Sequence, residues 1–259
     1  MSLFVPPRAP ASEAELLDVE PGRPDEIDDC LRELARVNRL LGGRRTTLAH
    51  LGPLLAATGK ERVTVLDVAA GGGDMAEAMR DWALRRGLNL RFTFLDRHPV
   101  VLDFSRRAAG FRPHLVLGDA LTLPFPDASF DLCVTSLFFH HLEPEEMEAS
   151  MREMRRVART GILVNDLVRD RLAWAWIVLL SRLFSRNRLV RHDGPLSVRR
   201  AYRPSDFRAL AAGSGFSRWG VRRHFPYRMC LWGLVGDESR RGAMQTERGA
   251  TLTEREARR

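Results

Sequence analysis

The chain is short of the residues that mark several common protein classes. Its 259 residues include three cysteines, two tyrosines and a single lysine. Cys30, Cys133 and Cys230 lie far apart and show no paired spacing, which argues against a disulfide framework and against a zinc site with cysteine ligands. Unpaired cysteines fit a reducing compartment, and the sequence predicts no metal site.

Long apolar runs are also missing. The most continuous run, Leu172–Leu180, is shorter than the roughly 20 residues that cross a bilayer as a helix. Residues 1–10 have neither the charged start nor the apolar stretch of a secretory signal. The sequence therefore predicts a cytoplasmic protein.

Positive charge is in excess but is not clustered. Arginine and lysine number 41 against 33 acidic residues, which gives a formal net charge of +8. A dense basic block would favour nucleic-acid binding, because clustered cations release counterions from phosphate backbones. Here the cations are spread from Arg8 to Arg259, so we predict no nucleic-acid partner.

The apolar pattern divides the chain into four parts. Residues 1–24 are rich in proline and acids and are predicted to form a flexible arm, and residues 25–60 are predicted to form two cap helices. Residues 61–236 alternate short apolar runs with amphipathic stretches, which is typical of βαβ units and predicts an α/β domain. Residues 237–259 are charged and low in apolar residues, so we expect disorder there.

The α/β domain is predicted to hold seven strands in a mostly parallel sheet, with helices on both faces and the last strand antiparallel. The predicted strands are Val63–Val68, Arg91–Leu95, His114–Leu117, Phe130–Thr135, Gly161–Asn165, Ser217–His224 and Tyr227–Gly236. The predicted helices between them are Asp74–Arg86, Pro99–Ala109, Pro144–Arg159 and Pro204–Ala212.

Residues 169–201 interrupt this alternation and are predicted to be a helical insertion. The run Leu172–Leu180 can be a buried or half-buried helix of the core. It can also be a lid over an apolar substrate that touches a membrane surface through Trp174 and Trp176, with arginines behind it. Both interpretations stay open.

A glycine loop follows the first predicted strand. Ala69-Ala70-Gly71-Gly72-Gly73 stands where the backbone must turn tightly and let a ligand approach its amides. Gly71, Gly73 and Ala76 also fit the spacing of the dinucleotide fingerprint, so a nicotinamide or flavin enzyme is an alternative. Asp67, at the end of the strand, disfavours a pyrophosphate there and favours a cationic ligand.

In these residues the sequence resembles the class I S-adenosylmethionine-dependent methyltransferases, whose first motif has an acid followed by spaced glycines. Ala69 departs from that pattern because it occupies the first glycine position, and we expect its small methyl group to be tolerated. The resemblance implies a Rossmann-like sheet and S-adenosylmethionine as the cofactor.

The resemblance extends over residues 62–236. It implies that Asp96, at the end of the second strand, accepts hydrogen bonds from both ribose hydroxyls. In Gly118-Asp119-Ala120 it implies an adenine site. The implied cofactor-binding residues are Asp67, Ala69, Gly71, Gly73, Asp96, Arg97, Asp119, Ala120 and Phe138.

Two histidines follow the fourth strand, at the edge where open α/β sheets bind ligands. We predict that His140 or His141 acts as a general base for an acidic hydroxyl, because histidine titrates near neutral pH; the alternative is a polar turn. Phe138 or Phe139 is predicted to line the methyl-transfer pocket. Asn165-Asp166 could contact substrate or pair with an arginine such as Arg169, and Asn38, Arg39, Arg44 and Arg45 could close over the cofactor.

The acceptor is predicted to be small and apolar. Residues 136–139 replace the Asp/Asn-Pro-Pro-aromatic motif of similar nucleic-acid methyltransferases. The apolar run and Phe138 favour instead an aromatic, polyketide or lipid-like molecule, methylated at oxygen, as in secondary metabolism. A NAD(P)-dependent oxidoreductase and a noncatalytic nucleoside-binding domain remain the alternatives.

Overall fold

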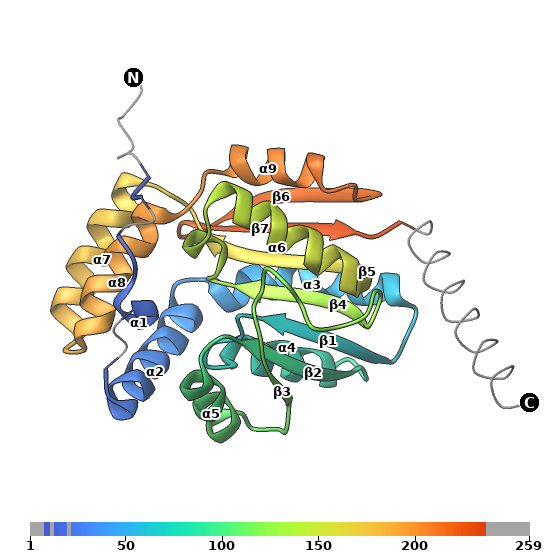
Figure 1. Ribbon diagram of the computed structural model, residues 1–259, viewed down its shortest axis with the longest axis horizontal. Helices are drawn as coiled ribbons and strands as arrows, with labels where there is room; N and C mark the ends of the chain where they lie inside the picture. Colours follow the sequence, from blue (N-terminus) through green and yellow to red (C-terminus); the bar gives the residue numbers. More distant parts are fainter. Residues whose placement is uncertain (1–7, 11–12, 20–21, 237–259) are drawn as a thin grey trace, which may run out of the picture.

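A single seven-stranded sheet forms the centre of the computed structural model, which describes residues 8–10, 13–19 and 22–236 (Figure 1). Its strands are β1 (Arg62–Val68), β2 (Asn89–Asp96), β3 (His114–Leu117), β4 (Phe130–Ser136), β5 (Ala158–Leu167), β6 (Arg218–His224) and β7 (Arg228–Leu234). They lie in the order β3-β2-β1-β4-β5-β7-β6. The first five strands are parallel and β7 is antiparallel to its neighbours, so the predicted Rossmann-like fold is confirmed.

Helices follow β1, β2, β4 and β5, as the sequence pattern indicates. The helices are α1 (Leu16–Val19), α2 (Pro24–Leu40), α3 (Gly43–Thr58), α4 (Asp74–Leu84), α5 (Pro99–Ala108), α6 (Pro144–Val157), α7 (Arg171–Phe184), α8 (Arg188–Arg200) and α9 (Pro204–Gly213), with a 3-10 turn, η1 (Phe139–His141). The helix predicted to reach Arg159 ends at Val157, because Ala158 already pairs with Phe130 of β4. The predicted disorder of residues 237–259 lies outside the described residues.

Both faces of the sheet are buried. On one face Val63 and Val65 of β1 belong to a core with α3 and α4. On the other, Leu66 and Val68 pack into a core with α6 and α9. A central parallel strand is covered on both sides in this way, which explains why β1 reads as a nearly continuous apolar run.

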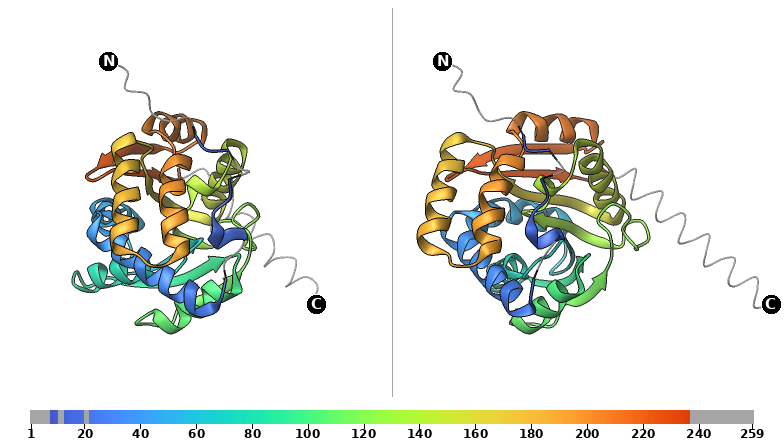
Figure 2. Two further views of the ribbon diagram at one scale, coloured as in Figure 1. Left: turned by 90° about the vertical axis from the view of Figure 1, so that its left-hand side faces the viewer. Right: turned by 60° about the vertical axis from the view of Figure 1, so that its left-hand side comes forward.

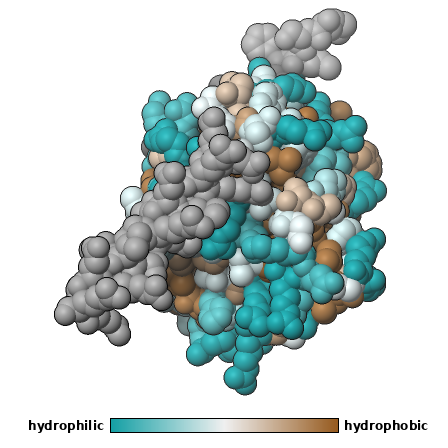
Figure 3. Space-filling view, turned by 90° about the vertical axis from the view of Figure 1, so that its right-hand side faces the viewer, coloured by the Kyte–Doolittle hydropathy of each residue, from teal (hydrophilic) through white to brown (hydrophobic). Residues whose placement is uncertain are grey.

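The helix pair α7 and α8 fills the region predicted as an insertion. Figure 2 shows the two helices side by side, with α1 and α2 next to them, beyond the carboxyl ends of the parallel strands. We call these four helices the roof. Helix α7 is only half-buried: Leu183 and Phe184 are 65% and 80% exposed. The opposite side of the molecule, in Figure 3, shows hydrophilic residues over much of its visible surface with apolar residues scattered between them.

The described part of the N-terminal arm is packed, although the arm was predicted to be flexible. Arg8 donates to the carbonyl oxygen of Arg200 and forms an ion pair with Glu143. Asp193 of α8 accepts from the backbone N–H groups of Leu16 and Leu17. These polar contacts, which the proline and acidic content does not predict, hold residues 8–10 and 13–19 against α8 and the start of α6.

Within the described part of the chain, every helix is too short or too polar to cross a membrane.

Asp131 ties the start of β4 to β1. Its buried carboxylate accepts from Lys60 Nζ and from the backbone N–H and hydroxyl of Thr64. Burial alone would raise the pKa of Asp131, but these hydrogen bonds outweigh burial and hold it below its usual value.

Replacing this carboxylate should therefore destabilise the sheet. We expect Asp131→Ala to lower the free energy of unfolding by about 1–3 kcal/mol, because the buried Thr64 donors lose their acceptor. Because the folded-state pKa is depressed, the contribution is complete above the usual pKa of about 4 and disappears as pH falls through the lower folded value. Denaturant unfolding across acidic pH should show the two proteins converging. The exposed Asp127→Ala is the control, and equal losses in both variants would contradict this account.

Candidate active site

A cavity of about 800 Å³ lies between the carboxyl ends of the parallel strands and the roof. Its floor includes the loops after β1, β2, β3 and β4, and its far wall includes residues of α2, α7 and α8. This is the edge at which open α/β sheets bind ligands, and the volume is within the range of small-molecule sites. The cavity therefore holds the candidate active site.

The loop after β1 needs a left-handed backbone at three places. Ala69, Gly71 and Gly73 have φ values of +54°, +54° and +75°. A Cβ at Gly73 would lie 2.8 Å from the ring of Phe94, whereas one at Gly71 would meet nothing within 4 Å. Gly73 thus serves close helix-to-strand packing and is not among the residues lining the cavity, while Gly71 and Ala69 do line it.

Asp96 joins the glycine loop to the end of β2. One carboxylate oxygen accepts from the backbone N–H of Gly71 at 3.2 Å and the other from the backbone N–H of His98 at 3.0 Å. Each carboxylate oxygen can accept further bonds, and the side chain borders the cavity. Its position fits the diol-binding role that the resemblance implies.

Buried charges of both signs surround this end of the cavity. Asp67 is buried and its Oδ2 has no hydrogen-bond partner; burial, together with Asp74 and Asp96, raises its pKa well above the usual value. Arg228, 1% exposed, donates through Nη2 to Asn38, while its Nη1 has no partner. Burial lowers the pKa of Arg228 to about 10, against the opposite effect of Asp166 and Asp74. A ligand carrying both an ammonium and a carboxylate would satisfy both orphan atoms.

The other predicted cofactor residues divide between cavity and core. Arg97, Asp119, Ala120 and Phe138 line the cavity. Asp119 accepts from the backbone N–H of Leu121, which fixes its turn. The second predicted aromatic residue, Phe139, is fully buried in the core and does not line the cavity.

His140 and His141 lie on η1 and line the cavity. His140 Nδ1 is 2.7 Å from Asp166 Oδ1, and His141 Nδ1 is 2.8 Å from Asp18 Oδ2. Burial would lower the pKa of His140, but Asp166 and Glu15 outweigh it and raise the pKa to about 10. A raised pKa makes His140 less suited to accept a proton near neutral pH. The base role of His140 or His141 stays a prediction.

Several polar residues on the rim have partners other than those predicted. Asp166 pairs with His140 and not with Arg169, because η1 lies between β5 and the roof. Asn165 donates to the carbonyl of Gly43 and to Thr47, so it anchors α3.

Two of the four polar residues predicted to close over the cofactor lie at the cavity or next to a residue that lines it. Asn38 borders the cavity and donates to Asp74, and Arg44 Nε is 3.7 Å from the same carboxylate. Arg45 instead donates to the carbonyl of Phe225, and Arg39 is exposed.

Glu15 is a cavity residue that carries no sequence signal. It stands in a segment of proline and acidic residues, 125 positions before His140, and only the folding of the arm onto α8 brings it to the cavity. Its carboxylate is almost completely buried, and the histidines outweigh burial and lower its pKa.

One face of α7 completes the apolar wall. Trp176, Ile177 and Leu180 line the cavity, whereas Trp174 does not. The spacing of three and four residues puts the lining side chains on one side of the helix. Of the two tryptophans predicted to form a lid, one is therefore placed to meet a ligand.

Comparisons with known proteins indicate a methyltransferase. Residues 65–161 match the family described as "Methyltransferase domain". A demethylmenaquinone methyltransferase of Roseiflexus castenholzii is 36% identical over 96 residues, which is 37% of this chain and 38% of that relative. The chain thus spans less than two thirds of this relative's length.

Solved structures share the fold over a larger part of the chain. Human N-acetylserotonin methyltransferase in complex with S-adenosylmethionine (SAM) aligns with a TM-score of 0.62 and 16% identity, covering 88% of this chain and 60% of that one. Plantazolicin methyltransferase in complex with S-adenosylhomocysteine (SAH) gives a TM-score of 0.62 and 13% identity, covering 87% and 96%. The fold is that of the class I SAM-dependent methyltransferases. The family match over residues 65–161 and the shared fold confirm the resemblance.

The left-handed backbone at Ala69 predicts an unusual response to glycine. An L-residue in this region costs roughly 1–2 kcal/mol, and glycine removes that cost while adding freedom to the unfolded chain. We expect Ala69→Gly to raise the free energy of unfolding, by up to about 1 kcal/mol.

The neighbouring Ala70, which is not in the left-handed region, is the matched control. Ala70→Gly should lower the free energy of unfolding by about 0.4–1 kcal/mol. Denaturant titration of both variants measures the difference, and a loss of stability in Ala69→Gly as large as that in Ala70→Gly would show that the loop is not strained.

Proposed function

We propose that the protein is a methyltransferase that uses SAM to methylate a small apolar acceptor, at oxygen. The observation that carries the proposal is the pair of buried orphan atoms, Asp67 Oδ2 and Arg228 Nη1, at the glycine-loop end of the cavity. SAM has an amino acid end with both charges and a sulfonium, so buried carboxylates and one guanidinium suit it. A dinucleotide would instead bring a pyrophosphate next to Asp67, which charge disfavours.

Binding of the other parts of SAM follows from the same cavity. In this proposal Asp96 accepts from the ribose hydroxyls, while Asp119 and Ala120 contact the adenine; all three line the cavity. Phe138 and the loop after β4 lie towards the roof, between the cofactor end and the apolar wall. This assignment also distinguishes the proposal from a noncatalytic nucleoside-binding domain, which would need no acceptor pocket.

Methyl transfer is an in-line displacement. The acceptor oxygen forms a bond to the methyl carbon while the carbon–sulfur bond breaks, the electron pair stays on sulfur, and the hydroxyl proton passes to water. The sulfonium already activates the methyl group, so the protein mainly aligns the reactants, which can contribute roughly 7–11 kcal/mol.

The proposed class of acceptor is inferred from the side chains that the roof contributes to the cavity wall. Residues 169–201 act as a lid in this proposal, and Trp176, Ile177 and Leu180 give the cavity an apolar wall. The matching relatives support a small-molecule acceptor in general terms, since one is named for demethylmenaquinone and another for plantazolicin. Peripheral membrane contact through the exposed side chains of α7 stays a prediction, as does a cytoplasmic location.

Calorimetry tests the cofactor. SAM and SAH should bind and raise the melting temperature, whereas NAD and NADP should not, because a ligand that binds the native state alone stabilises it by mass action. Tighter binding of NAD or NADP would overturn the proposal in favour of an oxidoreductase.

Arg228→Met tests the orientation of the cofactor. If the guanidinium holds the carboxylate, the variant loses a charged hydrogen bond of about 1.5–3 kcal/mol, and SAH affinity falls about 10- to 100-fold. Methylthioadenosine, which lacks the amino acid end, should bind wild type and variant alike, and this ligand also shows that the variant is folded. Equal losses for both ligands would contradict the assignment.

Trp176→Ser tests the acceptor wall. The variant should raise KM for an apolar phenol or quinol by about 5- to 30-fold, equivalent to about 1–2 kcal/mol of lost apolar burial, with SAM affinity unchanged. Trp174→Ser changes the same residue type on the same helix outside the cavity, so it should leave KM within about twofold. If the two variants behave alike, α7 does not line the acceptor site.

A further inference from the structure

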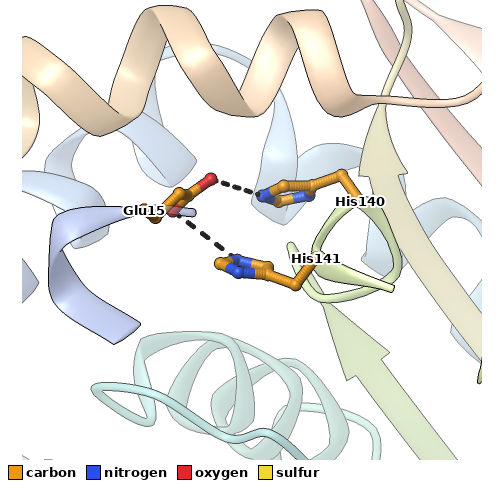
Figure 4. Close-up of side chains that lie close together, drawn as sticks. All are labelled: Glu15, His140 and His141. Carbon is orange, nitrogen blue, oxygen red and sulfur yellow. Dashed lines mark ion pairs between the residues drawn. The ribbon is translucent and has the colours of Figure 1, made fainter. Parts of the chain in front are cut away.

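Glu15, His140 and His141 form a compact cluster on the cavity wall (Figure 4). One ligand atom from each lies within 4.8 Å of the others. His140 Nε2 is 3.5 Å from Glu15 Oε1, and His141 Nε2 is 3.7 Å from Glu15 Oε2. Hydrogen bonds between nitrogen and oxygen are shorter, at about 2.7–3.2 Å. The ligands of a tetrahedral zinc ion with bonds of about 2.1 Å, by contrast, are separated by about 3.4 Å.

A hydrogen bond to a residue outside the cluster orients each of the three side chains. Asp166 and Asp18 bind the Nδ1 atoms of His140 and His141, which leaves both Nε2 atoms directed at Glu15. Ser197 of α8 donates to Glu15 Oε1 at 2.6 Å. Metal-binding histidines are held in this way, with Nδ1–H donated to a carboxylate and the Nε2 lone pair free for the ion.

The charge of the cluster favours a cation. Three carboxylates, from Glu15, Asp18 and Asp166, surround two imidazoles, and two of the three are nearly fully buried. The guanidinium of Arg200 donates to the carbonyl oxygens of His140 and His141. A bound divalent ion would replace the imidazole protons at Nε2, and its charge would compensate the surrounding carboxylates.

We propose that Glu15, His140 and His141 bind one divalent transition-metal ion of the Zn²⁺ type. Imidazole and carboxylate ligands suit such ions, and three protein ligands leave coordination positions for a substrate, here on the cavity side. The ion's role rests on the proposed methyl transfer: it would bind the acceptor hydroxyl through oxygen and lower its pKa, so that the proton leaves to water before the methyl group arrives.

Zinc binding by the untagged full-length protein tests the site without SAM or acceptor. Chelator-treated protein is dialysed against Zn²⁺, and bound metal is measured by atomic emission. We expect one zinc per chain in the wild type and none above background in His141→Ala or Glu15→Gln. Asp18→Ala keeps all three ligands but removes the hydrogen bond to His141, so zinc affinity should fall about 10- to 100-fold.

His50→Ala is the matched control. His50 and His224 form a second histidine pair, with Nε2 atoms 2.9 Å apart, far from the cluster in the sequence. One zinc that remains in this variant and disappears in the two ligand variants supports the proposal. Absence of zinc in the wild type, or its loss in His50→Ala alone, overturns the proposal; the cluster is then an ion network that holds residues 13–19 against η1.

Two further measurements keep the outcome interpretable. Circular dichroism shows whether the ligand variants are folded. Should they unfold, Asp18→Ala decides, and unchanged zinc affinity in that variant contradicts the proposal. SAH binding is measured separately on the wild type, so failure of the methyltransferase proposal is distinguished from failure of the metal site.

Discussion

The reversal of strand order at β1 and β4 determines where chemistry can take place in this protein. The chain runs outwards from β1 to β3 and then returns to place β4 on the other side of β1. The loops after β1 and β4 therefore diverge, and the gap between them becomes the floor of the cavity. The glycine loop, Asp96 and the histidine turn all depend on this one feature of the sheet.

Charged and apolar side chains lie in different parts of the cavity. Buried carboxylates and Arg228 gather at the glycine-loop end, where unpaired charge in a low dielectric is costly unless a ligand matches it. The α7 wall is apolar instead. The proposed charged cofactor and apolar acceptor would then lie in separate parts of the cavity and meet near Phe138 and the histidines, as methyl transfer requires.

The arm changes the chemical character of that contact zone. Without residues 13–19, His140 would be a histidine paired with Asp166, which is the geometry of a general base. Glu15 adds a second carboxylate on the opposite nitrogen, and Asp18 holds His141 beside it. The same two histidines that the sequence suggests as a base thereby become candidate ligands of a metal ion.

The sequence alone determined the layers of the fold and most of the cavity edge where the cofactor is proposed to bind. Apolar periodicity is local, so strands and helices follow from it, and the carboxyl end of a strand is known once the strand is known; Asp67, Asp96 and Asp119 could be placed in this way. Tertiary structure decided what no local pattern encodes: the strained φ of Ala69, the burial of Arg228 beside Asn38, the partner of Asp166, and the approach of Glu15 across 125 residues. These features depend on packing between segments that are distant in the sequence. Buried polar atoms need hydrogen-bond partners, and only the fold decides which residues can supply them.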